Sequence, residues 1–145
     1  MSFSVYKSSA GSGKTYTLVK EYLSLVLINP FQFKSILAIT FTNKAAAEMK
    51  QRVLQSLRLI ANYQQLTTVE RKPIIHLLPD LALKTGLKES DIIRNAGLTL
   101  SLILHNYSNF AVGTIDSFVH RIVRTFAHDL RLPLNFNVEM DGETF

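Results

Sequence analysis

The chain has 145 residues, 47% of them hydrophobic, a formal net charge of +5 and a sequence pI of about 9.6. This size corresponds to one domain or to part of a longer protein, and the basic charge is compatible with a polyanionic partner such as nucleic acid. The absence of cysteine excludes disulfides and thiolate metal sites. No secretory signal and no apolar run long enough to cross a bilayer is evident, which predicts a cytoplasmic protein without a membrane partner.

The N-terminal stretch has the order strand, loop, helix. A β-type segment at residues 3–7 precedes the loop Ser8-Ser9-Ala10-Gly11-Ser12-Gly13-Lys14-Thr15, and a helical pattern follows to residue 28. This is the context of a phosphate-binding loop, in which backbone N–H groups and a helix N-terminus surround the phosphates. The standard motif has glycine where Ser8 stands, and the alternative interpretation is a Gly/Ser-rich surface turn.

The loop predicts ATP and Mg²⁺ as cofactors. Lys14 is expected to reach the β- and γ-phosphates, and the Thr15 hydroxyl is expected to bind Mg²⁺. These two residues are the candidates for a part in phosphoryl chemistry. The residues expected to surround the nucleotide are Ser8, Ser9, Ala10, Gly11, Ser12, Gly13, Lys14, Thr15 and Tyr16.

The first helix is predicted from about residue 13 to residue 28 and ends at Asn29-Pro30. Its shared apolar face consists of Leu18, Tyr22, Leu25 and Val26. Residues 35–41 predict a second strand, whose run of four apolar residues suits a central parallel strand covered on both faces. Thr42 or Asn43 is expected to cap a helix that continues to about residue 61. The buried stripe of that helix is predicted to be Ala46, Met49, Val53, Leu57 and Ile60.

Residues 62–106 predict a helical excursion between two strands. It begins with a polar loop or frayed helix at 62–72 and a short helix at 73–83, and a turn at Gly86 leads to a helix that Ser90 would cap. The inward residues of that helix are predicted to be Ile93, Ala96, Leu100 and either Ile103 or Leu104. Residues 110–114 predict a third strand, followed by a helix from about residue 116 to 130. The core side of this last helix is predicted to be Phe118, Ile122, Val123 and Phe126.

Three separated stretches resemble motifs of superfamily 1 helicases of the UvrD type. Residues 9–15 resemble the first motif, residues 36–49 resemble motif Ia almost residue for residue, and residues 112–118 resemble the motif that follows. The UvrD pattern usually has histidine where Asp116 stands. The Ser-Ala-Gly-Ser-Gly-Lys-Thr form of the loop and the long excursion are closer to the AddA and RecB helicase–nuclease branch.

The resemblance implies an α/β fold: a partial RecA-like P-loop NTPase domain with parallel strands, flanking helices and a helical insertion at about 62–106. It implies a motor that moves 3′ to 5′ on single-stranded DNA in repair or recombination, with Phe41 stacking on bases. The residues that it places on DNA are Thr40, Phe41, Thr42, Asn43, Lys44, Thr114, Asp116, Ser117 and Phe118. Without the resemblance, Phe41 and Phe118 suit core aromatics, Asp116 suits an N-cap, and His120, Arg121 and Arg124 suit a solvated face.

ATP hydrolysis also needs a carboxylate pair at the end of an apolar strand and an arginine at the transferring phosphoryl group. No apolar strand in this sequence ends in such a pair. We therefore expect residues 1–145 to be the N-terminal part of motor domain 1A, inactive alone, with the other motor domain and any nuclease domain elsewhere in a longer chain. The expected partners are single-stranded DNA or duplex ends, a second helicase–nuclease subunit, and those remaining domains. The alternatives are a small phosphoryl-transfer kinase and a non-enzymatic nucleotide-binding interaction module.

Overall fold

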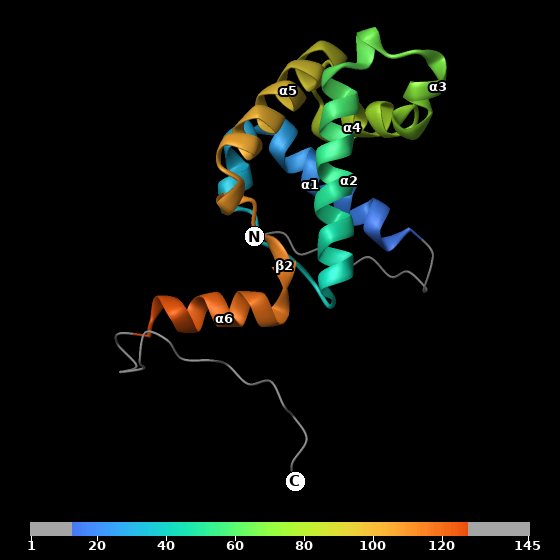
Figure 1. Ribbon diagram of the computed structural model, residues 1–145. Helices are drawn as coiled ribbons and strands as arrows, with labels where there is room; N and C mark the ends of the chain where they lie inside the picture. The colour runs from blue at the N-terminus through green and yellow to red at the C-terminus, as the bar shows by residue number, and fades with distance from the viewer. Residues whose placement is uncertain (1–12, 128–145) are drawn as a thin grey trace.

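The computed structural model describes residues 13–127. The predicted strand at residues 3–7 and the loop residues 8–12 lie outside this part of the chain. Its α-helices (α), 3₁₀-helices (η) and strands (β) are shown in Figure 1. In chain order they are α1 Lys14–Ile28, η1 Pro30–Ser35, β1 Ala38–Thr40, α2 Asn43–Ala61, η2 Tyr63–Gln65, α3 Thr68–Arg71, η3 Lys72–Ile74, α4 Leu77–Thr85, α5 Glu89–His105, η4 Tyr107–Asn109, β2 Val112–Thr114 and α6 Ile115–Thr125.

The two described strands, β1 and β2, pair in parallel. Their register places Ala38 opposite Val112 and Thr40 opposite Thr114. Parallel neighbours need a long crossover between them, and here α2 and the helices as far as η4 supply it. The coarse prediction of an α/β chain with parallel strands is therefore confirmed. Because the pairing is parallel, both strands end at the same edge.

The strand predicted at residues 35–41 is shorter than expected. Pro30 begins η1, and the Asn29 side chain accepts a hydrogen bond from the Phe31 N–H at 3.1 Å, so this segment winds into 3₁₀ turns as far as Ser35. Only Ala38–Thr40 remain extended in the ladder. Ile39 is exposed, so the predicted burial on both faces is wrong for the described part of the chain.

The core lies among α1, α2, α4 and α5, which form the upper part of the molecule in Figure 1. The buried stripe predicted for α2 is confirmed in full: Ala46, Met49, Val53, Leu57 and Ile60. The bounds of α1 are confirmed, and its predicted face is confirmed in part: Tyr22 and Val26 are buried. Leu18 and Leu25 are exposed, whereas Val19 and Leu23 are buried. An almost continuous apolar run gives little periodic contrast, so packing against neighbouring helices decides the rotation.

The segment between α2 and β2 is largely helical. Residues 62–72, expected as a loop or frayed helix, contain the short helical turns η2 and α3, and α3 has a capping box between Thr67 and Glu70. The hydrogen bond from the Thr67 backbone N–H lowers the pKa of the Glu70 carboxyl. Gly86 ends α4 in the left-handed region at φ 70°, as a helix C-terminus favours.

The start of α5 differs from the prediction by a few residues. Its N-cap is Lys88 rather than Ser90, because the Lys88 carbonyl already accepts from the N–H groups of Asp91 and Ile92. Ile93 and Leu100, predicted to point inward, are half-buried against the core. The fully inward residues of α5 are Ile92, Ala96, Thr99 and Ile103.

Helix α6 lies below the other helices in Figure 1 and contacts β1 and β2. None of its residues is buried, so the prediction that Phe118, Ile122, Val123 and Phe126 face the core is wrong within residues 13–127. The Asp116 cap is also wrong: Thr114 caps the helix in a reciprocal pair with Ser117. The helix is described as far as Thr125, and its predicted end at residue 130 lies outside the described residues.

Tyr22 packs α1 against the segment that precedes β2. Its ring meets Phe110 edge to face, with centroids 5.6 Å apart. The hydroxyl is buried, and no described residue is its hydrogen-bond partner. Burial raises the pKa of Tyr22 above its ordinary value.

We predict that Tyr22→Phe leaves the free energy of unfolding at pH 7 unchanged or raises it by up to about 1 kcal/mol, because an unpaired buried hydroxyl is removed. Above about pH 10 the unfolded chain loses a proton that folded Tyr22 keeps, so native stability falls by up to about 1.4 kcal/mol per pH unit. Tyr22→Phe should lack the part of this fall in stability that comes from the Tyr22 proton. Urea unfolding between pH 7 and 11 measures it, with exposed Tyr107→Phe as the control; a loss of stability at pH 7 would contradict the prediction.

Candidate nucleotide and nucleic-acid interface

Helix α1 begins directly after a left-handed residue. Gly13 has φ 85° and ψ 14°, and its carbonyl accepts the first hydrogen bond of the helix, from the Thr17 N–H at 2.9 Å. A Cβ at Gly13 would meet no atom of residues 13–127 within 4 Å, and the backbone angle alone favours glycine there. The turn into the helix at the end of the predicted phosphate loop is therefore confirmed.

The first turn of α1 has the properties of an anion site. No side chain caps the helix, and no acidic residue lies in its first turn. The N–H groups there lack intrahelical acceptors and carry the positive end of the helix dipole. Lys14 is exposed and Thr15 is half-buried beside them. These residues fit a bound phosphate chain, although Ser8 to Ser12 lie outside the described residues and the ATP and Mg²⁺ assignments stay predictions.

The ends of β1 and β2 bring two predicted DNA motifs to one edge. Phe41 directly follows β1, Asp116 and Phe118 belong to the first turns after β2, and the parallel register sets Thr40 beside Thr114. Phe41 is 87% exposed, so the alternative of a core aromatic is wrong for this residue. An exposed phenylalanine at a strand end is available for stacking. Phe118 is half-buried.

Several hydroxyl groups at this edge make hydrogen bonds with backbone groups. Thr40 Oγ1 lies 3.1 Å from the Thr42 carbonyl oxygen and 3.3 Å from that of Gly113. Thr42 caps α2 by accepting from the Ala45 N–H at 3.1 Å. Thr114 is buried, and its hydroxyl accepts from the Ser117 N–H at 3.2 Å. Thr42 and Ser117 are exposed, but their hydroxyls are engaged in the fold. The other exposed residues among those predicted to contact DNA are Phe41, Asn43, Lys44 and Asp116.

The sequence reasoning missed the part played by Gly113. Ser117 Oγ accepts from the Thr114 N–H at 2.9 Å and donates to the Thr114 carbonyl at 2.8 Å. A Cβ built on Gly113 would lie 2.7 Å from this oxygen. The Thr-x-x-Ser spacing at residues 114–117 was the available signal, since it places two hydroxyls across the start of a helix.

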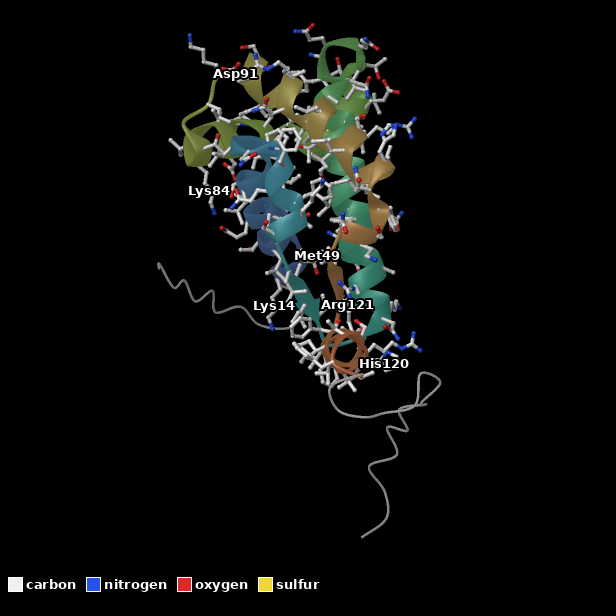
Figure 2. All side chains as sticks on the ribbon, turned by 90° about the vertical axis from the view of Figure 1, so that its left-hand side faces the viewer. Lys14, Met49, Lys84, Asp91, His120 and Arg121 are labelled. Atoms are coloured by element: carbon white, nitrogen blue, oxygen red, sulfur yellow. The ribbon has the colours of Figure 1, made fainter. Side chains whose placement is uncertain are left out.

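Exposed cations occur at this end of the molecule. Figure 2 shows Lys14 and Arg121, both exposed, in its lower part, and Figure 1 shows that α2 begins and β2 enters α6 on the same lower side. Lys44, in the first turn of α2, is exposed as well. Such a distribution favours a phosphate backbone as partner. Among residues 13–127 no cluster of acidic and histidine side chains could hold a metal ion, and no helix there is long and apolar enough to cross a bilayer.

A family model described as "UvrD/REP helicase N-terminal domain" matches residues 4–144. The chain is 44% identical over 136 residues to DNA helicase II of Haemophilus influenzae, an alignment that covers 94% of this chain and 13% of the relative. It is 28% identical over 144 residues to the RecB component of the RecBCD enzyme of the same organism, which covers 94% of this chain and 12% of the relative. No solved structure matches.

A third relative is an ATP-dependent helicase/nuclease of Lactococcus lactis, which is 27% identical over 134 residues. That alignment covers 92% of this chain and 9% of the relative. The chain therefore spans about a tenth of the length of the curated relatives that it matches. Relatives of both the helicase and the helicase–nuclease kind are among the matches, and the assignment to the second branch stays a prediction.

We predict that Gly113→Ala lowers the free energy of unfolding by about 1 to 2 kcal/mol, because the new methyl group displaces Ser117 Oγ and breaks the cap of α6. Ser117→Ala in the same chain removes the obstructing atom. The double variant should therefore lose less stability than the sum of the two single variants in a double-mutant cycle by urea unfolding. Additive losses would show that the two sites do not interact in this way.

Proposed function

Because the chain belongs to the UvrD/REP helicase N-terminal domain family, we propose that it is the N-terminal part of motor domain 1A of a longer ATP-dependent DNA helicase. The observation that supports this most is the uncapped start of α1 at Gly13 and Lys14, together with the exposed Phe41 where β1 ends. The start of α1 can bind phosphates, and Phe41 can stack on bases. The rest of that helicase would complete both sites.

In this proposal the phosphate loop from Ser8 to Thr15 holds ATP. Backbone N–H groups and Lys14 bind the β- and γ-phosphates, Thr15 is a ligand of Mg²⁺, and Tyr16 lies next to the nucleotide. Bound ATP would supply the free energy released when its phosphoanhydride bond is hydrolysed. The residues of this chain bind and orient the phosphates, whereas the carboxylates and the arginine that hydrolysis requires come from elsewhere in the helicase.

The DNA half of the proposal concerns the edge where β1 and β2 end. Phe41 stacks on a base of single-stranded DNA, which stabilises binding without reading sequence. Asn43 and Lys44 lie at the N-terminus of α2, where backbone N–H groups and a cation favour phosphate. Asp116 is a poor phosphate partner, so we assign it to the border of this edge, away from the phosphates. The helicase is proposed to move 3′ to 5′ along single-stranded DNA.

The same proposal extends to partners and pathway. Relatives named as RecB and as a helicase/nuclease match along more than nine-tenths of this chain. We therefore propose that the helicase acts at duplex DNA ends in repair or recombination, with a nuclease domain in the same chain and a second helicase–nuclease protein beside it. The excursion at residues 62–106 is the part that we assign to this branch.

We predict that Lys14→Ala in the intact helicase lowers DNA-stimulated ATP hydrolysis at least about a hundredfold, the scale for loss of one preorganised charge at a reacting group. Most of the DNA affinity should remain, because Lys14 belongs to the phosphate site. Phosphate release measures the first and fluorescence anisotropy the second. Lys72→Ala is the control, since Lys72 is also an exposed lysine but lies on η3.

Normal hydrolysis by Lys14→Ala would show that the nucleotide site is wrongly placed. Transfer of phosphate to a nucleoside monophosphate would favour the kinase alternative, and ATP binding without DNA affinity would favour the interaction module. The isolated 145 residues should show negligible turnover, because loss of an arginine finger alone lowers the rate by about 10³ to 10⁵.

We predict that Phe41→Ala weakens binding of the intact helicase to single-stranded DNA by about 1 to 3 kcal/mol, the contribution of one stacked base. Affinity should depend little on sequence and should fall as salt rises. Fluorescence anisotropy with oligonucleotides of differing sequence measures this. The control is Phe31→Ala, which removes another aromatic side chain that is 59% exposed; equal effects of the two variants would count against a specific stacking role.

A further inference from the structure

The N-terminal end of α1 has little apolar packing to hold it. None of residues 14–18 is buried, and Val19 is the first residue of the helix that enters the core. A hollow of about 410 Å³ separates Tyr16 from Arg52 of α2 and Ile74 of η3. A second hollow of about 400 Å³ lies between α1 and Leu83 of α4. Among the described residues, apolar packing thus sets the rotation of α1 from Val19 onward, and polar contacts are available to hold the turns before it.

Two ion pairs join this part of α1 to α4. Lys20 Nζ lies 2.5 Å from Asp80 Oδ2, and Lys84 Nζ pairs with Glu21 Oε1. All four side chains are partly buried, between 27% and 44% exposed. The hydrogen bond with Asp80 raises the pKa of Lys20, so the cation is retained. Figure 2 shows Lys84 beside α1, above Lys14.

The geometry of the two pairs restricts rotation of α1. Lys20 and Glu21 are adjacent, so their side chains leave the helix about 100° apart. Asp80 and Lys84 are four residues apart and therefore share one face of α4. The cation lies on α1 in one pair and on α4 in the other, so each α4 residue can pair with only one of the two α1 residues. A turn of α1 about its axis would break at least one pair.

The other end of α1 is held by α5. Asn95 Nδ2 donates to the Leu27 carbonyl at 2.8 Å, and Thr99 Oγ1 donates to the Val26 carbonyl at 3.3 Å. Thr99 is fully buried. These carbonyls belong to the last turn of the helix, where intrahelical donors are lacking. Residues of the excursion thus hold α1 at its C-terminal turn and again at Lys20 and Glu21, about 9 Å along the axis from Lys14.

We infer that Asp80 and Lys84 are positioning residues of the nucleotide site. Through Lys20 and Glu21 they hold α1 near its N-terminus in the rotation that its buried residues favour, and with it the direction of Lys14 and of the first-turn N–H groups. Neither residue belongs to the motifs on which the proposed function rests. The inference depends on that function, because it requires the start of α1 to bind ATP.

The test uses the intact helicase and exchanges charges across the contact. One variant reverses the α4 side, Asp80→Lys with Lys84→Asp. A second reverses the α1 side, Lys20→Glu with Glu21→Lys, and a third combines all four changes. Each exchange conserves net charge. The matched control neutralises an ion pair within α5, Asp91→Asn with Arg94→Gln, and is compared with Asp80→Asn/Lys84→Gln.

We expect Asp80→Asn/Lys84→Gln to raise the KM for Mg·ATP about threefold to tenfold with a smaller change in kcat, the scale of two partly exposed ion pairs. The one-sided reversals should raise the KM further. The variant that combines all four changes should return to within about twofold of the native KM. The control should keep the native KM. Thermal unfolding of every variant separates this result from a loss of stability alone.

A native KM in Asp80→Asn/Lys84→Gln and in both one-sided reversals would overturn the inference, as would a fourfold variant no better than either reversal. If Lys14→Ala abolishes hydrolysis while these variants behave as native, the proposed function stands and the positioning role fails. If Lys14→Ala hydrolyses ATP normally, the proposed function fails and the positioning role fails with it.

Discussion

The parallel pairing of β1 with β2 is the constraint on which the candidate DNA edge depends. A parallel neighbour cannot be reached by a tight turn, so the chain makes a long crossover through α2, α4 and α5 before it returns at Val112. That route buries the apolar face of α2 and returns Thr114 beside Thr40. Residues more than seventy positions apart in the chain thereby share an edge, and Phe41 is left exposed there.

The fold was predictable where the sequence alternates strongly between apolar and polar residues. The positions between Ala46 and Ile60 that face inward are separated by lysine, glutamate, glutamine and arginine, so the period of the helix determines its buried face. Helix α1 has no such contrast: Leu18 and Val19 are equally apolar, and only contact with other helices distinguishes them. The α6 prediction failed for a related reason, since an amphipathic pattern identifies an apolar face without giving its partner.

The candidate site was predictable where it is local. The Gly-Lys-Thr step at the start of a helix is written within a few residues, and the structure describes Gly13 in the left-handed region that such a step favours. The exposure of the Phe41 side chain was not predictable from the sequence, because an aromatic residue after an apolar strand suits a core as well as a binding edge. The pairing of Thr114 with Ser117 was missed because Asp116, a good capping residue by type, lies between them.

The excursion connects the two halves of the proposed site. Its ends continue covalently into α2 on one side and β2 on the other, so it is tied to the edge that carries Phe41. Its middle is joined to α1 by Asp80, Lys84, Asn95 and Thr99, and α1 begins at the turn that we propose binds phosphate. A displacement of the excursion that leaves α1 and α2 in place would strain the ion pairs on α1 and the packing of α5 on α2. In the proposed site, residues between the recognisable motifs thus contribute through the helix that they hold in place.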